Sequence, residues 1–304
     1  MTMQLVIALG GNALLRRGEP LEHQVQLKNV ERAARALADV ADLHQVVITH
    51  GNGPQVGLLS LQSEAYRGVA PYPLDVLDAE SEGMIGYLLE QALGNRLPHR
   101  EIATLLTQVL VRADDPAFSN PTKPVGPMYR RSEAEQLALT NGWTIAADGD
   151  GYRRVVASPE PQAIVEMRAI RALLKSNVIV ICAGGGGIPV TIDARTLGLH
   201  GAPAVIDKDH ASALLAIELK ANMLLFLTDV DGVHRTWPDP DGEHITLATV
   251  DEMRALDLPD GSMGPKVDAA CRFVEATGNQ AVIGSLDDAA AMLAGHAGTT
   301  IKGS

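Results

Sequence analysis

The sequence has 304 residues, of which 46% are hydrophobic and 20% charged, so it is globular in composition and long enough for one large α/β domain or two ordinary ones. Acidic residues outnumber basic ones by 37 to 25, and the net charge of −12 argues against a protein that binds nucleic acid or an anionic membrane, since both need a basic face. No apolar run approaches the roughly 20 residues that span a bilayer, and two cysteines make no disulfide framework, so we expect a cytoplasmic protein.

Short apolar runs alternate with helical patterns along the chain. The runs that we expect to be strands are residues 4–9, 46–49, 103–111, 178–183, 223–228 and 281–284. Apolar residues at helical spacing over 30–41 and 84–92 predict two of the helices between them. Strands that alternate with helices indicate an α/β fold with a mainly parallel sheet covered on both faces.

Two stretches interrupt this alternation. Residues 114–127 hold four prolines and cannot form a helix interior. Within residues 143–161, the sequence Asp148-Gly149-Asp150-Gly151 separates two strand-like runs, which is typical of a β-hairpin. We therefore expect a small unit, about residues 115–161, inserted into the sheet domain.

Glycine-rich turns follow four of the predicted strands, at residues 10–12, 50–53, 184–187 and 229–232. In open α/β sheets ligands bind beyond the carboxyl ends of the strands, and glycine lets backbone N–H groups turn toward an anion. A single glycine pair is usually only a tight turn, but four such loops favour a phosphate or acyl phosphate ligand. The loop at residues 184–187 does not match the G-x-G-x-x-G fingerprint of dinucleotide-binding proteins, because Val190 occupies the position of its last glycine. The sequence therefore gives only weak support to a dehydrogenase.

Seven lysines divide into two groups. Those expected on the surface are Lys28, Lys175, Lys220 and Lys302. Lys208 lies between two aspartates, Asp207 and Asp209, at a junction of strand and helix, Lys266 precedes a helical pattern, and Lys123 lies among prolines. Lysine is a compact point charge suited to phosphate oxygens, and either aspartate could fix the Lys208 ammonium.

Other polar residues have simpler interpretations. Asp78, Glu80 and Glu82 precede an apolar stripe and read as the charge pattern of a helix start. His50, at a strand end, either touches a ligand or makes a structural hydrogen bond. The histidines show no zinc-binding spacing, so we expect no metal site in the protein itself.

Seven motifs in chain order resemble those of the carbamate kinases. They are ALGGNAL at 8–14, THGNGPQVG at 49–57, KPVGP at 123–127, VVASP at 155–159, GGGGIPV at 184–190, AVIDKD at 204–209 and GSMGPK at 261–266. The resemblance implies the amino acid kinase fold, an open three-layer α/β/α sandwich with a protruding subdomain near 115–161. It also implies the reaction ATP + carbamate ⇌ ADP + carbamoyl phosphate, Mg²⁺ carried by the nucleotide, and a homodimer.

The same resemblance divides a single domain, 1–304, into two functional parts. Residues 1–200 would bind carbamate or carbamoyl phosphate and residues 201–304 the nucleotide. The implied catalytic residues are Lys123, Lys208, Lys266 and Asp209. The implied substrate-binding residues are Gly10, Gly11, Asn12, Gly51, Asn52, Gly53, Gly185 and Gly186. The implied nucleotide-binding residues are Thr228, Asp229, Val230, Asp231, Met263, Gly264 and Lys266.

One position separates this chain from the related acetylglutamate kinases, which carry a lysine two residues before the first glycine pair. Here that residue is Ala8, and the resemblance assigns the missing charge to Lys123. Two other functions stay open at this point. One is a kinase of another small carboxylate, and the other is a nucleotide or phosphate sensor without catalysis. The supply of carbamoyl phosphate, from arginine or another ureido compound, is also open.

Overall fold

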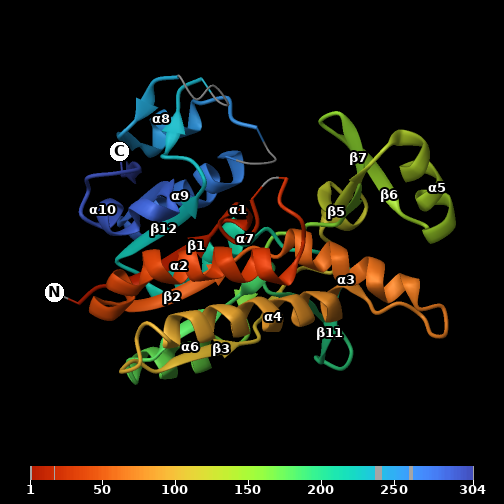
Figure 1. The fold of residues 1–304 in the computed structure, drawn as a ribbon, viewed down its shortest axis with the longest axis horizontal. Coiled ribbons are helices and arrows are strands. Elements are labelled where there is room, and N and C mark those ends of the chain that lie inside the picture. The colour runs from red at the N-terminus through yellow and green to blue at the C-terminus, as the bar shows by residue number, and fades with distance from the viewer. Residues whose placement is uncertain (1, 17, 237–241, 260–262, 304) are drawn as a thin grey trace.

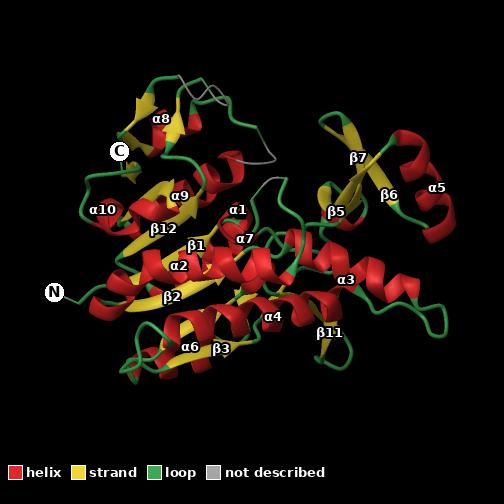
Figure 2. Ribbon diagram, in the orientation of Figure 1, coloured by secondary structure: helices red, strands yellow, loops and turns green. Residues whose placement is uncertain are grey.

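The computed structural model describes residues 2–16, 18–236, 242–259 and 263–303, and one large sheet forms the centre of its fold (Figures 1 and 2). The sheet has the strand order β15-β17-β16-β12-β1-β2-β9-β3. In chain order these strands are β1 (Gln4–Leu9), β2 (Gln45–His50), β3 (Ile102–Leu105), β9 (Ile179–Cys182), β12 (Met223–Thr228), β15 (Leu247–Thr249), β16 (Gln280–Ser285) and β17 (Thr299–Lys302). Only the β16–β17 pair is antiparallel among them, so the expected mainly parallel sheet is confirmed.

Helices cover both faces of this sheet because successive strand residues point to opposite sides. In β1, Leu5, Ile7 and Leu9 join one apolar cluster, whereas Val6 and Ala8 join the other. The first face is covered by α1 (Gly11–Leu14), α2 (His23–Leu43), α4 (Leu74–Gly94) and α10 (Ala289–Leu293). The second is covered by α6 (Met167–Lys175), α7 (Lys208–Leu219), α8 (Val250–Arg254) and α9 (Met263–Thr277).

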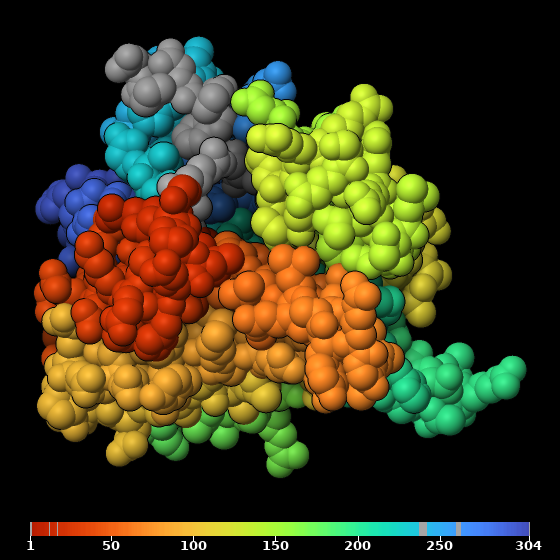
Figure 3. Space-filling model, turned by 45° about the vertical axis from the view of Figure 1, so that its right-hand side comes forward, coloured from red at the N-terminus to blue at the C-terminus, as the bar shows by residue number. Residues whose placement is uncertain are grey.

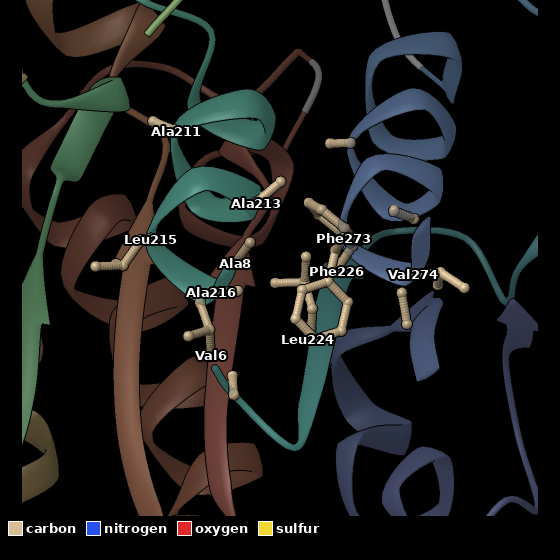
Figure 4. Packing of buried hydrophobic residues seen from close by; sticks show 14 of the residues in the cluster. Val6, Ala8, Ala211, Ala213, Leu215, Ala216, Leu224, Phe226, Phe273 and Val274 are labelled. Atoms are coloured by element: carbon tan, nitrogen blue, oxygen red, sulfur yellow. The ribbon is translucent and has the colours of Figure 1, made fainter. Parts of the chain in front are cut away.

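The core on the second face is built around two aromatic rings. Figure 4 shows Phe226 of β12 and Phe273 of α9 gathered with alanines of α7, such as Ala213 and Ala216. Both phenylalanines are fully buried. The small side chains of α7 let this helix lie close to the sheet, and so they place its first residues near the strand ends.

One predicted strand is wrong. Residues 103–111 form two strands in different sheets, β3 in the large sheet and β4 (Gln108–Leu110) in a second one of order β11-β10-β4-β8. The chain turns at Thr107, whose hydroxyl donates to the Leu105 carbonyl at 2.7 Å and whose N–H donates to Glu82 at 3.1 Å. No glycine or proline marks this turn in the sequence. The N–H of Thr107, which leaves the strand ladder here, is satisfied by the distant carboxyl group of Glu82.

Smaller elements complete the fold. The second sheet also contains β8 (Ala163–Ile164), β10 (Ile188–Ile192) and β11 (Leu199–Gly201). The others are a β13 (Val233–His234) and β14 (His244–Ile245) pair, α3 (Gly53–Ala65), and the 3₁₀ turns η1 (Pro116–Phe118), η2 (Gly184–Gly186) and η3 (Leu286–Asp288). Over the described ranges, no helix combines the length and apolar character needed to cross a membrane.

The inserted unit is a three-stranded sheet of its own with one helix, and it protrudes from the main body beside α3 (Figures 1 and 3). It contains β5 (Lys123–Tyr129), α5 (Arg131–Asn141), β6 (Thr144–Asp148) and β7 (Gly151–Val156), with strand order β5-β7-β6. The hairpin expected at residues 148–151 is present, since Asp148 pairs with Gly151. The prolines of β5 are tolerated because this strand is an edge of its sheet.

Candidate active site

Four adjacent parallel strands, β12, β1, β2 and β9, end at the same edge of the large sheet, and the four glycine-rich turns follow them. The turns are in direct contact. The N–H of Gly10 donates to the Leu227 carbonyl at 2.7 Å, and the N–H of Gly51 donates to the Leu9 carbonyl at 3.1 Å. A Cβ on Gly51 would lie 3.0 Å from the Gly11 Cα, so any side chain there would separate the loops.

The other predicted substrate-binding residues lie at the same edge. Gly185 rests on the Asn52 side chain, because a Cβ on this glycine would lie 2.1 Å from the amide nitrogen. Gly53 is the first residue of α3, and the backbone of Asn12 belongs to the short helix α1, while the Asn12 side chain lies outside the described residues. The loops therefore present helix starts and glycine backbone, as an anion site requires.

Lys208 and Lys266 come from different helices and meet on one carboxylate. Asp209 Oδ1 accepts from Lys208 Nζ at 2.6 Å, and its Oδ2 accepts from Lys266 Nζ at 3.2 Å. Only 5% of the Asp209 side chain is exposed. The Lys208 chain also passes over Gly51, whose Cβ would lie 3.3 Å from the lysine Cδ. Asp209 thus fixes two ammonium groups beside the glycine loops.

Burial and charge act in opposite directions on this triad. Burial raises the pKa of Asp209, but the two lysines outweigh it and hold that pKa below its ordinary value. Burial lowers the pKa of Lys208, and Asp209 offsets this effect only in part. Burial also acts to lower the pKa of Lys266, but Asp209 and Asp207 together outweigh it and raise that pKa. The site therefore keeps a charged carboxylate between its two cations.

Asp207 joins the inserted unit to the site. Its Oδ2 accepts from Lys123 Nζ at 2.5 Å, while its Oδ1 caps α7 by accepting from the N–H of Asp209 at 2.8 Å. Burial favours the neutral acid, but Lys123 and Lys208 overcome it and keep the pKa of Asp207 far below the usual range. The sequence left open whether Asp207 or Asp209 holds Lys208; the hydrogen bond goes to Asp209, and Asp207 holds Lys123.

The loop that carries Lys123 is docked through a contact between glycines. A Cβ on Gly57 of α3 would lie 2.2 Å from the Gly126 Cα, so only glycine allows this approach. Gly126 itself has φ +73°, a left-handed conformation that glycine adopts without strain. The proline-rich motif is thus held against α3, and its lysine points to the start of α7.

The predicted nucleotide-binding residues divide into two groups. Thr228 lies against Gly10, because a Cβ on Gly10 would lie 3.6 Å from the Thr228 hydroxyl. The same hydroxyl donates to Asp229 Oδ1 at 3.1 Å. Asp231 instead pairs with His234 at 2.9 Å. At the start of α9, Met263 is buried and Gly264 lies against the Pro259 carbonyl. Residues 261 and 262 of that motif lie outside the described residues.

Sequence reasoning was wrong about two acidic residues of α4. Asp78 and Glu82 do not mark a helix start: α4 begins at Leu74, and each of these side chains is only 1% exposed. Asp78 accepts from the Asn52 amide at 3.1 Å, and Glu82 accepts from the N–H of Gly184 at 2.8 Å. Their spacing of four residues, on the face that also carries Ile85 and Leu89, was the available signal of burial.

His50 makes a structural contact. Its ring is fully buried, and Nδ1 lies 3.1 Å from the Gly51 carbonyl. Burial lowers the pKa of His50 to about 4, so the ring is neutral at physiological pH. Lys28, Lys175, Lys220 and Lys302 are exposed as predicted. In the part of the chain that the structure describes, no three acidic, histidine or cysteine side chains form a metal-binding group.

The family of the chain follows from its relatives. Residues 3–285 match the model of the amino acid kinase family, so the chain belongs to this family. Within it, the chain groups with the carbamate kinases. It is 52% identical to "Carbamate kinase" of Rhizobium meliloti, over 99% of this chain and 94% of that protein, and 53% identical to the Haemophilus influenzae protein of the same name, over 98% and 96%.

Solved structures agree with this assignment. The structure titled "Carbamate kinase from Giardia lamblia bound to AMP-PNP" superposes with a TM-score of 0.90 at 42% identity, covering 100% of this chain and 99% of that one. The α/β architecture expected from the sequence is therefore that of the amino acid kinases. The protein is therefore a kinase.

Proposed function

We propose that this protein transfers a phosphoryl group reversibly between ATP and carbamate, giving ADP and carbamoyl phosphate. The observation that supports the reaction most directly is the pair of lysines, Lys208 and Lys266, bridged by buried Asp209 beside the glycine loops. Phosphoryl transfer needs alignment and charge stabilisation more than covalent help. Two fixed cations from different helices suit a group that moves between two anionic substrates.

The residues would act as follows. Lys208 and Lys123 neutralise the equatorial oxygens of the moving phosphoryl group, and Lys266 holds the leaving bridge oxygen of ATP. The backbone N–H groups of the loops at residues 10–12 and 51–53, with Gly185 and Gly186, bind the carbamoyl part. Asp209 orients two of the lysines. Carbamate carries its own nucleophilic oxygen, so the reaction needs no general base.

The two substrates would occupy different parts of the domain. Residues 1–200, including the inserted unit, hold carbamate or carbamoyl phosphate, and residues 201–304 hold the nucleotide near residues 228–231 and 263–266. Mg²⁺ would be carried by the nucleotide phosphates, since Asp207 and Asp209 already pair with lysines. Lys123 supplies the positive charge that Ala8 does not.

We also propose a cytoplasmic homodimer that makes ATP during breakdown of arginine or another ureido compound. The two cysteines are unpaired thiols, which suits a reducing compartment. An exposed apolar strip on α4, formed by Val76, Met84 and Tyr87 with neighbouring Leu106, is a surface that a second subunit could cover.

A coupled assay for ATP formation from carbamoyl phosphate and MgADP tests the reaction. Carbamoyl phosphate decays spontaneously, but only a phosphotransferase converts ADP into ATP. We expect ATP formation that depends on Lys208. A folded protein that binds ADP but makes no ATP would contradict the proposal. A panel of small carboxylic acids with ATP would then separate another acid kinase from a sensor.

A further inference from the structure

One buried acidic side chain is not used by this mechanism. Glu82 lies in the middle of α4, and its two oxygens accept from backbone N–H groups of different segments. Oε1 accepts from Gly184 at 2.8 Å and Oε2 from Thr107 at 3.1 Å. Gly184 follows β9 and Thr107 follows β3, so one carboxyl group joins the helix to the ends of two neighbouring strands.

The segment held in this way is the tetraglycine loop, residues 184–187. Gly185, Gly186 and Gly187 have φ values of +70°, +102° and +85°, which glycine adopts and other residues rarely do. Because these residues have no side chains, the loop must be held through its backbone. Gly184 has no room for a side chain: its Cβ would lie 2.3 Å from His50 Nε2 and 3.0 Å from Glu82 Cγ.

The loop leads directly to the active site. Gly185 rests on the amide of Asn52, and a Cβ on Gly186 would lie 2.4 Å from the carbonyl oxygen of Ile206. Ile206 stands two residues before Lys208. A displacement of Gly184 would therefore be passed to a substrate-binding side chain and to the segment that places the catalytic lysine.

We propose that Glu82 is a positioning residue for phosphoryl transfer: its carboxylate holds the backbone of Gly184 and Thr107 and so sets the tetraglycine loop against Asn52 and the start of α7. This inference rests on the proposed function, since the step that it supports is the transfer to or from the carbamoyl group. Glu82 touches no substrate in this role; it acts through the loop.

The ionised form of Glu82 suits this role better than the neutral acid. A carboxylate accepts both N–H groups, whereas a protonated oxygen places a donor against one of them. The titratable groups around it are Asp78 on α4, Glu166 before α6, the Cys182 thiol of β9 and the His50 ring of β2. Burial above all, with the Glu166 charge, raises the pKa of Glu82 to about 8.

The test compares Glu82→Gln with a matched control, Glu90→Gln. Glu90 lies two turns further along α4 and accepts from the N–H of Thr104 at 2.8 Å, so the control makes the same substitution at another contact between a carboxylate and a backbone N–H, without touching the loop. The carbonyl oxygen of glutamine can still accept this one N–H, whereas at position 82 it can replace only one of two acceptors. At about pH 9 we expect Glu82→Gln to lower kcat by roughly ten- to a hundredfold, with the KM for ADP little changed. Near pH 6.5 the kcat values of Glu82→Gln and wild type should lie closer together, because glutamine resembles the protonated form of Glu82. Glu90→Gln should stay close to wild type at both pH values.

Amide hydrogen exchange at Gly184 and Thr107 gives a readout that does not use activity. We expect faster exchange in Glu82→Gln, with the difference from wild type largest above about pH 8. Wild-type kcat and exchange in Glu82→Gln at pH 9, or a loss of kcat that is equal at both pH values, would overturn the inference. If Glu82→Gln does not fold, the kcat of the wild type must still rise with pH through about pH 8, and a flat pH profile of kcat contradicts the role of Glu82.

If the wild type makes no ATP, the proposed function fails. Hydrogen exchange at Gly184 and Thr107 then still tests the contact of these residues with Glu82.

Discussion

At the scale of single residues, the candidate active site differs in charge from the molecule around it. The chain carries a net charge of −12, yet three lysines, Lys123, Lys208 and Lys266, meet two carboxylates at the strand ends. These five side chains together carry one net positive charge where an anionic substrate would bind. Because buried Asp209 holds Lys208 and Lys266 in place, these two cations need no reorganisation when charge moves in the reaction.

Lys208→Ala is expected to lower kcat by about 10²–10³, the usual effect of removing one donor that stabilises the transition state. The variant should still fold, since Asp209 keeps its bond to Lys266. The assay of ATP formation from carbamoyl phosphate measures the loss, and circular dichroism checks folding. Lys28→Ala, an exposed position on α2, is the control and should match wild type. Near-normal turnover by folded Lys208→Ala would remove Lys208 from the mechanism.

Lys123→Ala should lower kcat and also raise the KM for carbamoyl phosphate. Lys123 is the only one of the three lysines carried by the inserted unit, and 32% of its side chain is exposed, so it can leave Asp207 for a bound anion. Steady-state kinetics with carbamoyl phosphate varied at fixed ADP measures both parameters. If neither parameter changes, Lys123 does not replace the charge missing at Ala8.

At the scale of elements, the sequence predicted most strands of the main sheet and their mainly parallel arrangement, but not β15, β17 or the contacts that support the loops. The strands at residues 4–9 and 223–228 were found with their bounds because each is an apolar run that ends in a glycine or Asp-Gly turn. The break between β3 and β4 was missed because its cause, the contact of Thr107 with Glu82, lies 25 residues away. The local sequence indicates turns and hydrophobic periodicity, whereas a buried contact between distant polar residues becomes visible only in the tertiary fold.

The candidate site shows the same division. Glycine loops and the three lysines were visible as motifs, and the structure brings Gly10, Gly11, Gly51 and Lys208 into contact. The partner of Lys123, by contrast, could not be read from the sequence, because Asp207 is 84 residues distant. The buried carboxyl groups of α4 were misread for a related reason: acidic residues are usually exposed, and only their partners explain their burial.

The raised pKa of Glu82 also leads to a prediction of how the stability of the fold depends on pH. The folded-state pKa of Glu82 is raised to about 8 from 4.5, so its contribution to stability is full below pH 4.5 and is lost as pH rises to 8. His50 has the opposite effect, but only between about 4 and 6.5, where its pKa is lowered. Between pH 6.5 and 8 the free energy of unfolding of wild type should therefore fall relative to that of Glu82→Gln. Urea unfolding at several pH values measures this difference.

A constant difference between the two proteins over that range would contradict the raised pKa. If the free energy of unfolding of wild type falls relative to that of Glu82→Gln, the ionised carboxylate of Glu82 destabilises the fold while it orders the tetraglycine loop. Such a conflict is expected at a site where function, rather than stability, determines the residue.

At the scale of the whole molecule, the apolar strip on α4 predicts self-association. Val76, Met84 and Tyr87 recur on one side of the helix, and Leu106 adjoins them, because a Cβ on Gly83 would lie 3.8 Å from its side chain. We expect light scattering to give about twice the mass of one chain. Tyr87→Glu should shift the protein toward the monomer by placing a charge in an apolar interface.

Leu139→Glu is the matched control, since Leu139 on α5 is 89% exposed but lies on the inserted unit, away from the strip. A dimer that persists in Tyr87→Glu, or dissociates in Leu139→Glu, would place the interface elsewhere. Lys123, Lys208, Lys266 and their aspartates all belong to one chain, so the Tyr87→Glu monomer should keep its kcat. A monomer without activity would instead mean that the second subunit holds α4, and with it Glu82 and the tetraglycine loop, in the catalytic arrangement.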